Sequence, residues 1–220
     1  LPLAISFFTF QQITYLVDSY AGRTKEYVWL RYCLFVTFFP QLIAGPFVLH
    51  AEMMPQFARR ALAHPRAMDL AVGLTIFSFG LFKKAVLADG IAPYADSVFA
   101  AAEQGEALDI TRAWGGALAY TFQLYFDFSG YSDMAIAVAR MFGILLPQNF
   151  NSPYKARDII DFWRRWHMTL SRFLRDYVYI PLGGNRRGML RRHSNLLATM
   201  LLGGLWPGAG WNFVIWGGLH

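Results

Sequence analysis

The sequence predicts an all-α, polytopic membrane protein, and two observations carry this prediction. Hydrophobic residues make up 55% of the 220 residues and charged residues only 15%, against about 25% charged residues in soluble domains. Residues 32–51 and 194–220 contain no Asp, Glu, Lys or Arg, and each run meets the roughly 20 apolar residues that cross a bilayer as a helix. The single cysteine, Cys33, excludes an internal disulfide and a cysteine-rich metal site.

The apolar residues form successive segments, without an internal repeat or a low-complexity linker, at 1–17, 28–49, 68–92, 113–147 and 195–219. The first segment begins with Leu1 and has neither the basic start nor the cleavage-site pattern of a signal peptide. The last apolar run ends at His220. We therefore expect residues 1–220 to be the central fragment of one membrane domain, with further helices on both sides.

The charges of the connecting segments predict the orientation, because Lys and Arg accumulate in cytoplasmic loops. Residues 52–66 carry three arginines, whereas residues 93–111 carry four acidic residues and no basic one. Residues 148–192 hold ten Lys or Arg against three Asp, a net charge of +7. We expect the first and third of these segments on the cytoplasmic side and residues 93–111 outside. The number of crossings between 93–111 and 148–192 must then be odd.

Two apolar segments do not have the pattern of one straight crossing. Residues 28–49 contain Pro40 and Pro46, and proline breaks a helix, so we predict a re-entrant or sharply bent element. Residues 113–147 are too long for one crossing at about 1.5 Å per residue and are interrupted by the polar stretch DFSGYSD at 127–133. We predict two helical pieces that meet there at a kink.

Residues 158–179 predict an amphipathic helix. At 100° per residue one face is apolar and the opposite face is charged. The first holds Ile159, Trp163, Trp166, Leu170, Phe173, Leu174 and Tyr177, and the second holds Asp158, Asp161, Arg164, Arg165, Arg172, Arg175 and Asp176. A helix of this composition lies along a membrane interface with its apolar face down. We expect Arg164, Arg165, Arg172 and Arg175 to face cytoplasmic lipid or to receive a donor molecule.

Three ionisable residues in these segments are candidates for chemistry. His167 lies at the boundary of the amphipathic helix, where it is able to bind a head group, line a cavity or transfer a proton. The alternative is an interface residue whose nitrogens are satisfied by neighbours. Asp127 and Asp133 lie in an apolar stretch, where carboxylates face a protein interior or a watery cavity. Hydrogen bonding around a kink at Gly130 is the structural alternative.

Other site types have no support in the sequence. No pair of His or carboxylate residues has metal-ligand spacing, and no phosphate-binding glycine loop is present. The glycine-rich run 203–211 indicates close helix packing, since Gly204 and Gly208 have small-xxx-small spacing. Pro207 interrupts this run and predicts a kink. Anionic lipid or an acidic donor, rather than nucleic acid, is the expected partner of the basic residues.

Several motifs together resemble the membrane-bound O-acyltransferase (MBOAT) family, in particular its bacterial alginate O-acetyltransferase branch. They are FPQLIAGP at 39–46, GLFKK at 80–84, YFDFSGYSDM at 125–134, PQNFNSPY at 147–154, the stretch 162–186, and GGLWPGAGW at 203–211. They occur in family order over nearly the whole chain. The related D-alanyl transfer branch shares the Trp-His and Arg-Asp wording of 162–186 but not its YIPLGGNR ending.

The resemblance implies a helical bundle of the MBOAT type with a central tunnel and cytoplasmic amphipathic helices, in the bacterial inner membrane. It implies transfer of an acetyl group from a cytoplasmic donor, acetyl-CoA or an acyl carrier, toward a periplasmic partner protein or a cell-surface polysaccharide such as alginate. No bound cofactor or metal is implied. His167 matches one of the family's two histidines, and we expect Asp127, Asp133, Trp163, Trp206 and Asn212 to line or support the tunnel.

The sequence departs from the family at the second histidine. Family members read Gly-x-Trp-His-Gly where this chain has GLWPG at 204–208, so Pro207 occupies the position of the expected catalytic histidine. Proline has no titratable side chain and cannot replace an imidazole. An inactive copy or an error in the sequence is a better explanation than rescue by His167 or by His220, about 20 Å further along a helix. The alternative functions are a non-catalytic homologue that binds a donor or partner, and a transporter built on broken helices.

Overall fold

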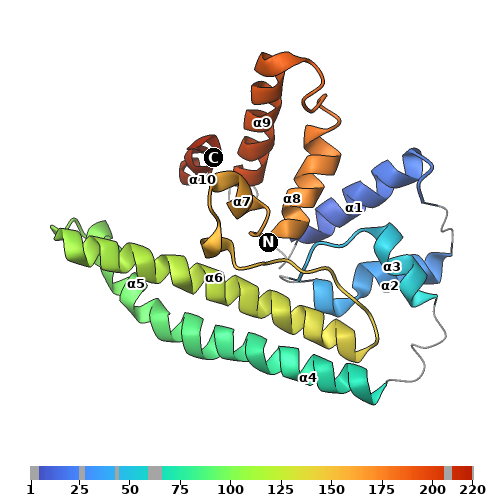
Figure 1. Ribbon diagram of the computed structural model, residues 1–220, viewed down its shortest axis with the longest axis horizontal. Helices are drawn as coiled ribbons and strands as arrows, with labels where there is room; N and C mark the ends of the chain where they lie inside the picture. Colours follow the sequence, from blue (N-terminus) through green and yellow to red (C-terminus); the bar gives the residue numbers. More distant parts are fainter. Residues whose placement is uncertain (1–4, 25–27, 43–44, 59–65, 206–209, 220) are drawn as a thin grey trace. The chain divides into compact units, whose positions relative to one another are not determined.

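The computed structural model describes residues 5–24, 28–42, 45–58, 66–205 and 210–219, and their regular elements are all helical (Figure 1). This agrees with the predicted all-α class. The chain divides into two compact units. The hairpin unit comprises Cys33–Pro46 and Met53–Leu146, and the terminal unit comprises Leu1–Tyr32, Phe47–Glu52 and Pro147–His220.

The hairpin unit is built on two long antiparallel helical rods (Figure 1). The first is continuous over Ala67–Glu103 and consists of α4 (Ala67–Phe82), the π-helical turn η3 (Lys83–Ala88) and α5 (Asp89–Glu103). The second is α6 (Ile110–Met141). Within the described ranges, Ala67–Glu103 is the one helix long and apolar enough to cross a membrane. Its 37 residues extend about 55 Å, more than the roughly 30 Å hydrocarbon core requires.

The predicted outer loop at 93–111 is therefore wrong for its first part, which continues α5 to Glu103. Pro93 does not interrupt the helix, although it lies inside it. The loop is confined to 104–109, and α6 begins after Asp109, whose Oδ1 accepts a hydrogen bond from the backbone N–H of Arg112 at 2.9 Å. This is an N-cap contact, which satisfies a donor that the first turn leaves open.

The predicted kink at 127–133 is also wrong, because α6 runs through it without interruption. Gly130 instead brings α6 against the first rod, where an added Cβ would lie 2.7 Å from the carbonyl oxygen of Gly80. The two carboxylates reach lysines of that rod: Asp133 Oδ2 lies 2.6 Å from Lys83 Nζ, and Asp127 Oδ1 lies 2.9 Å from Lys84 Nζ. The polar residues of 127–133 therefore lie where the two rods cross. The departure from regular α-helix occurs in the first rod, at the π-helical turn η3, and not in α6.

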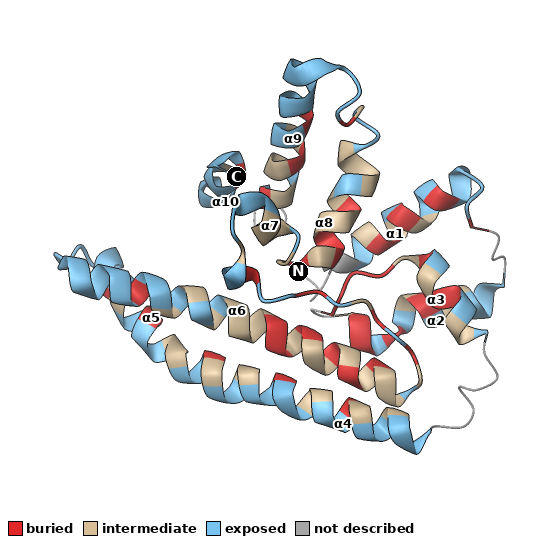
Figure 2. Cartoon of the chain, viewed as in Figure 1, coloured by how far each residue is buried: buried red, intermediate tan, exposed pale blue. Residues whose placement is uncertain are grey.

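Small residues fill the interface of the hairpin, while large apolar side chains point outward. The buried positions of the two rods are Gly, Ala and Ser residues, among them Gly73, Gly80, Gly116, Gly130, Ala135, Ala137 and Ala139. Phe79, Leu74 and Leu118 are more than half exposed, and exposed residues cover much of α4 and α5 (Figure 2). Membrane helices associate through small residues and present apolar side chains to lipid. The hairpin has this distribution.

The terminal unit contains α1 (Ile5–Tyr20), the short 3-10 turn η4 (Pro153–Lys155), α7 (Ile159–Trp163), α8 (Met168–Leu174), the π-helical turn η5 (Arg175–Tyr179), α9 (Gly188–Leu205) and α10 (Trp211–Leu219). Helices α2 (Trp29–Thr37) and α3 (His50–Phe57) each contribute residues to both units. The prediction that 28–49 is not one straight helix is confirmed. Helix α2 ends at Thr37 and the 3-10 turn η1 (Phe39–Gln41), which contains Pro40, follows. A re-entrant course stays a prediction.

Residues 158–179 do not form the single amphipathic helix that the sequence predicts. Helix α7 ends at Trp163, and His167 has a φ of 42°, a left-handed conformation that an α-helix of L-residues does not continue. The reason is a pair of backbone hydrogen bonds to a distant segment. Met168 N donates to Asn149 O, and Asn151 N donates to Arg165 O, each at 2.9 Å. The predicted apolar face persists in α8, where Leu170 and Phe173 are buried against Phe47.

Helices α9 and α10 pack closely through glycine, as the sequence suggested. A Cβ on Gly204 would lie 2.5 Å from the carbonyl oxygen of Phe213 and 3.0 Å from Cα of Gly217. Gly204 therefore packs against Gly217, and Gly208, the other glycine of the predicted small-xxx-small spacing, lies outside the described residues. The apolar run 195–219 is not one helix, because α9 ends at Leu205 and α10 starts at Trp211. The predicted kink residue, Pro207, also lies outside the described residues.

Candidate active site

His167 is the centre of the candidate site. It directly precedes α8, and its side chain is only 6% exposed. A positive φ at a residue other than glycine costs on the order of 1–3 kcal/mol and persists only where surrounding contacts impose it. The hydrogen bonds of Met168 and Asn151 on either side of the turn are such contacts. The buried imidazole therefore lies at a backbone turn that is stabilised by hydrogen bonds to residues 149 and 151.

The imidazole has a defined polar environment. Its Nδ1 lies 3.0 Å from Oδ1 of Asn149, a residue with no solvent exposure. The hydroxyl of Thr169 donates to the same oxygen at 2.8 Å, and Thr169 Oγ1 in turn accepts from the backbone N–H of Phe47 at 2.9 Å. The ring of Phe150 is stacked near the imidazole, with centroids 6.3 Å apart.

Burial lowers the pKa of His167 from 6.5 to about 3, because a low-dielectric environment disfavours the charged imidazolium. The residue lies outside Ala67–Glu103, the candidate membrane span. At neutral pH the ring is therefore uncharged, with one nitrogen as donor and the other as acceptor. A neutral imidazole is able to accept a proton in a reaction, which an imidazolium cannot do.

The other predicted tunnel residues fall in different places. Asp127 and Asp133 belong to the hairpin unit, in ion pairs with Lys84 and Lys83. Trp163 lies in the terminal unit at the end of α7, where its ring makes an edge contact with Trp216 of α10 at 5.5 Å. The carbonyl of Trp163 accepts from the hydroxyl of Ser171 at 3.2 Å. These contacts tie α7 to α10 and α8.

Asn212 is exposed on α10. Trp206 and Pro207 lie outside the described residues, so the position of the expected catalytic histidine has no structural description. Among the residues that are described, no three His, Cys, Asp or Glu side chains gather as metal ligands.

The four arginines predicted for the cytoplasmic interface have different surroundings. Arg164 is exposed. Arg165 Nε donates to Asp161 at 2.9 Å, and this hydrogen bond lowers the pKa of Asp161. Arg172 makes a two-pronged contact with Glu52, at 2.6 and 2.9 Å. Arg175 pairs with its neighbour Asp176 at 2.7 Å. The basic face is thus partly neutralised by carboxylates.

The sequence analysis missed Asn149 and Thr169, the polar residues of the hydrogen-bond network at His167, and the other buried polar residues of this unit. Buried polar side chains of the terminal unit include Gln11, Thr14, Asp18, His50, Asn149 and Thr169. Tyr177 donates to Asp18 Oδ2 at 2.6 Å, and burial, followed by this carboxylate, raises the pKa of Tyr177. Asn149 belongs to the PQNFNSPY motif, but that motif served only to support the family resemblance. A search for polar residues within apolar-flanked motifs would have selected it.

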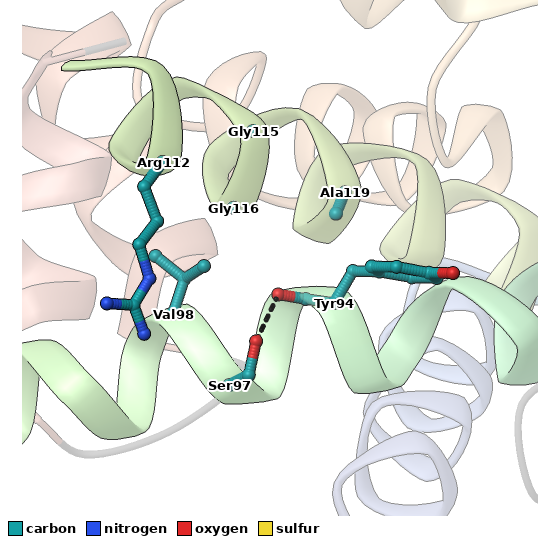
Figure 3. Close-up of a pocket in the computed structure, with 7 residues that line it drawn as sticks. All are labelled: Tyr94, Ser97, Val98, Arg112, Gly115, Gly116 and Ala119. Atoms are coloured by element: carbon teal, nitrogen blue, oxygen red, sulfur yellow. Dashed lines mark hydrogen bonds between the residues drawn. The ribbon is translucent and has the colours of Figure 1, made fainter. Parts of the chain in front are cut away.

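A separate pocket of about 400 Å³ lies between α5 and α6 in the hairpin unit (Figure 3). Its lining is Tyr94, Ser97, Val98, Arg112, Gly115, Gly116 and Ala119. The hydroxyl of Ser97 donates to the carbonyl of Tyr94 at 3.1 Å, and Arg112 pairs with Glu106 at 3.6 Å. The pocket contains none of the predicted site residues, and its small residues on α6 account for the space.

Comparison with known proteins supports the resemblance. The family model of the membrane-bound O-acyltransferases matches residues 7–220. The chain is 53% identical to a peptidoglycan O-acetyltransferase of Helicobacter pylori and 49% identical to a probable alginate O-acetylase of Azotobacter vinelandii. All of the chain aligns in both cases, covering 46% and 43% of those proteins.

A teichoic acid D-alanyltransferase of Bacillus subtilis is more distant, at 28% identity over 99% of the chain and 56% of that protein. The chain therefore spans less than half the length of the two O-acetyltransferase relatives. The family model covers residues 7–220, which is nearly the whole of this chain. The chain belongs to the membrane-bound O-acyltransferase family.

Proposed function

We propose that the fold of this protein serves the transfer of an acetyl group from a cytoplasmic donor to a hydroxyl of a cell-surface glycan, and that turnover requires a histidine at position 207, where this chain has proline. The observation that carries the proposal is a buried, uncharged His167 in a polar network, within a chain of the O-acyltransferase family. The names of the two relatives, an O-acetyltransferase and a probable O-acetylase, support acetyl as the transferred group. They give two acceptors, peptidoglycan and alginate, at similar identity, so both classes of glycan belong to the test.

The proposed reaction is a balanced acyl transfer. An imidazole nitrogen takes the proton of the acceptor hydroxyl, and the oxygen attacks the carbonyl carbon of the acetyl donor. The bond from that carbon to the donor's leaving group then breaks, and the leaving group receives the proton. A general base of this kind contributes about 10²–10⁴-fold to a rate. Water exclusion in the proposed tunnel would protect the acyl group from hydrolysis.

We propose that position 207 carries out the proton transfer and that His167 acts as a supporting group. Because proline cannot accept a proton, we expect the protein as found to be inactive and Pro207→His to restore turnover. The proposed location is the cytoplasmic membrane. The protein would cross this membrane several times, with residues 148–192 on the cytoplasmic side. The apolar rod Ala67–Glu103 and the net charge of +7 in 148–192 support this location.

The test is complementation of an acetylation-deficient strain with the full-length gene. Four forms are compared: the gene as found, Pro207→His, His167→Gln, and the combination of both changes. Acetyl esters are measured by mass spectrometry on muropeptides and on exopolysaccharide. Acetylation with Pro207→His alone would support the proposal. Equal acetylation with and without His at 207 would contradict the role of that position, and no acetylation by any form would contradict the proposed function.

A further inference from the structure

We propose that Asn149 is a positioning residue that holds His167 in one tautomer, with the proton on Nδ1 and the lone pair on Nε2. The inference rests on the proposed function for its chemical meaning, because it names the nitrogen through which the supporting His167 would accept a hydrogen bond. The observations behind it are the directions of the hydrogen bonds among Phe47, Asn149, His167 and Thr169, which all belong to the terminal unit.

The backbone N–H of Phe47 can only donate a hydrogen bond. It donates to Oγ1 of Thr169 at 2.9 Å. Since this hydroxyl accepts there, its own single hydrogen is available for the next contact. That contact is Oδ1 of Asn149 at 2.8 Å. The backbone N–H of Thr169, another obligatory donor, also points to the same atom at 3.4 Å.

These donors fix the orientation of the Asn149 amide. The oxygen and nitrogen of an asparagine side chain are distinguished by their partners. If the amide were reversed, its NH₂ group would face two donor groups of Thr169 and would have to displace the hydroxyl hydrogen. The side chain has no solvent exposure, so water does not compensate there. The atom that faces Thr169 is therefore the carbonyl oxygen.

The tautomer of His167 follows from this orientation. Its Nδ1 lies 3.0 Å from the same Asn149 oxygen, which is only an acceptor. A hydrogen bond at that distance requires Nδ1 to carry the hydrogen. In a neutral imidazole the other nitrogen, Nε2, then holds the lone pair and acts as acceptor or base. The opposite tautomer would place two acceptors against each other in a buried site.

The backbone of Asn149 holds the same geometry. Its carbonyl oxygen accepts from Met168 N at 2.9 Å, directly after the left-handed residue His167. Asn149 thus contacts the turn through both its main chain and its side chain. Because a strained turn persists only where its surroundings impose it, removal of the side chain leaves the backbone contact as support. This makes a side-chain substitution a test of the tautomer rather than of the turn alone.

The test uses full-length protein in nanodiscs, with ¹⁵N-labelled histidine side chains. The His167 signals are those absent from His167→Gln, and their shifts and couplings report which nitrogen carries hydrogen. We expect hydrogen on Nδ1 in the unmodified protein and in Asn149→Asp, which keeps an acceptor oxygen. Asn149→Ala and Thr169→Val should each give a mixture of tautomers. Asn151→Ala, an exposed residue of the same segment, is the matched control and should leave the signals unchanged.

Kinetics supply the second readout, in the Pro207→His background. We expect Asn149→Ala to lower kcat about 10- to 100-fold with little change in KM, as for the loss of groups that orient a reacting residue. A proton on Nε2 of the unmodified protein, or an unchanged tautomer and kcat in Asn149→Ala, would overturn the inference. No acetylation by any form, with the tautomers as expected, would refute the proposed function and leave the tautomer assignment standing.

Discussion

The two units use their buried space in opposite ways. In the two rods of the hairpin unit the buried positions are small residues such as Gly80, Gly130 and Ala137, while large apolar side chains such as Phe79 are exposed. In the terminal unit buried polar residues such as Asn149, His167 and Thr169 lie together with an aromatic cluster around Phe173. The first arrangement suits a surround of lipid, since small residues let helices approach. The second suits chemistry, because buried polar groups that hydrogen-bond to one another keep fixed orientations.

Polar residues have a different role in each unit. In the hairpin, Asp133 and Lys83 neutralise each other across two helices. Around His167 the contacts are between neutral groups, with a fixed direction of donation. A charge pair stabilises a crossing without selecting a tautomer, whereas the neutral chain does select one. Substitutions should therefore act on stability in the hairpin and on chemistry around the histidine.

The largest expected effect on stability comes from breaking the Lys83–Asp133 pair, whose atoms lie 2.6 Å apart. Lys83→Met leaves the Asp133 carboxylate of α6 without its partner at the helix crossing, and an unpaired charge at membrane depth costs about 3 kcal/mol. We expect the free energy of unfolding in nanodiscs to fall by about that amount. The double change Lys83→Met with Asp133→Asn should recover part of the loss, because it removes both charges.

Lys155→Met, at an exposed position in the terminal unit, is the matched control and should change stability by less than about 0.5 kcal/mol. An equal loss in the double and single variants would indicate that the ion pair does not couple the helices. The double-mutant cycle thus separates a charge effect from a loss of packing.

A smaller effect is expected from adding a methyl group at the helix crossing. In Gly130→Ala the new Cβ would lie 2.7 Å from the Gly80 carbonyl, so the backbones must separate. We expect a loss of about 2 kcal/mol in the free energy of unfolding, as for overpacking elsewhere. Gly115→Ala on the same helix meets no atom within 4 Å. It should leave stability equal or raise it by about 0.5 kcal/mol. Equal effects at both positions would refute the close crossing.

The hairpin also shows why part of the fold could be predicted from the sequence and part could not. Composition and charge-free runs predict helices and their approximate places, since these depend on local properties. The stretch 127–133 has two physical solutions, a kink or a crossing with a charged partner helix. The choice depends on Lys83, fifty residues before Asp133. Periodicity within 113–147 carries no information about that partner, so the predicted kink was wrong.

The site has the same limit. The sequence selected His167 through its place at the boundary of the predicted amphipathic helix and through the family resemblance. It did not predict the left-handed backbone at His167, because that conformation is imposed by hydrogen bonds from Asn149 and Asn151. The predicted helix 158–179 used a regular 100° rotation, which such a turn interrupts. The apolar face of α8 was predictable because Leu170 and Phe173 lie after the turn, within one regular helix.

The smallest expected effect is the response of stability to acid, which distinguishes the neutral site from the charged hairpin. In the unfolded chain His167 binds a proton below pH 6.5, whereas in the folded protein burial lowers its pKa to about 3. Between these values the unfolded state holds more protons, so acidification favours unfolding. At pH 5.5 the expected loss is about 1.4 kcal/mol relative to the plateau above pH 6.5.

His167→Gln removes this titration, so its stability should fall by about 1.4 kcal/mol less than that of the unmodified protein between pH 7.5 and 5.5. Chemical unfolding in nanodiscs at the two pH values measures the difference. His193→Gln, at an exposed position on α9, is the control and should keep the full acid response. An equal response in His167→Gln would mean that the imidazole is protonated as readily when folded as when unfolded. A buried, neutral imidazole at this position would then be excluded. The burial that keeps the imidazole neutral is also what makes the stability of the fold sensitive to acid.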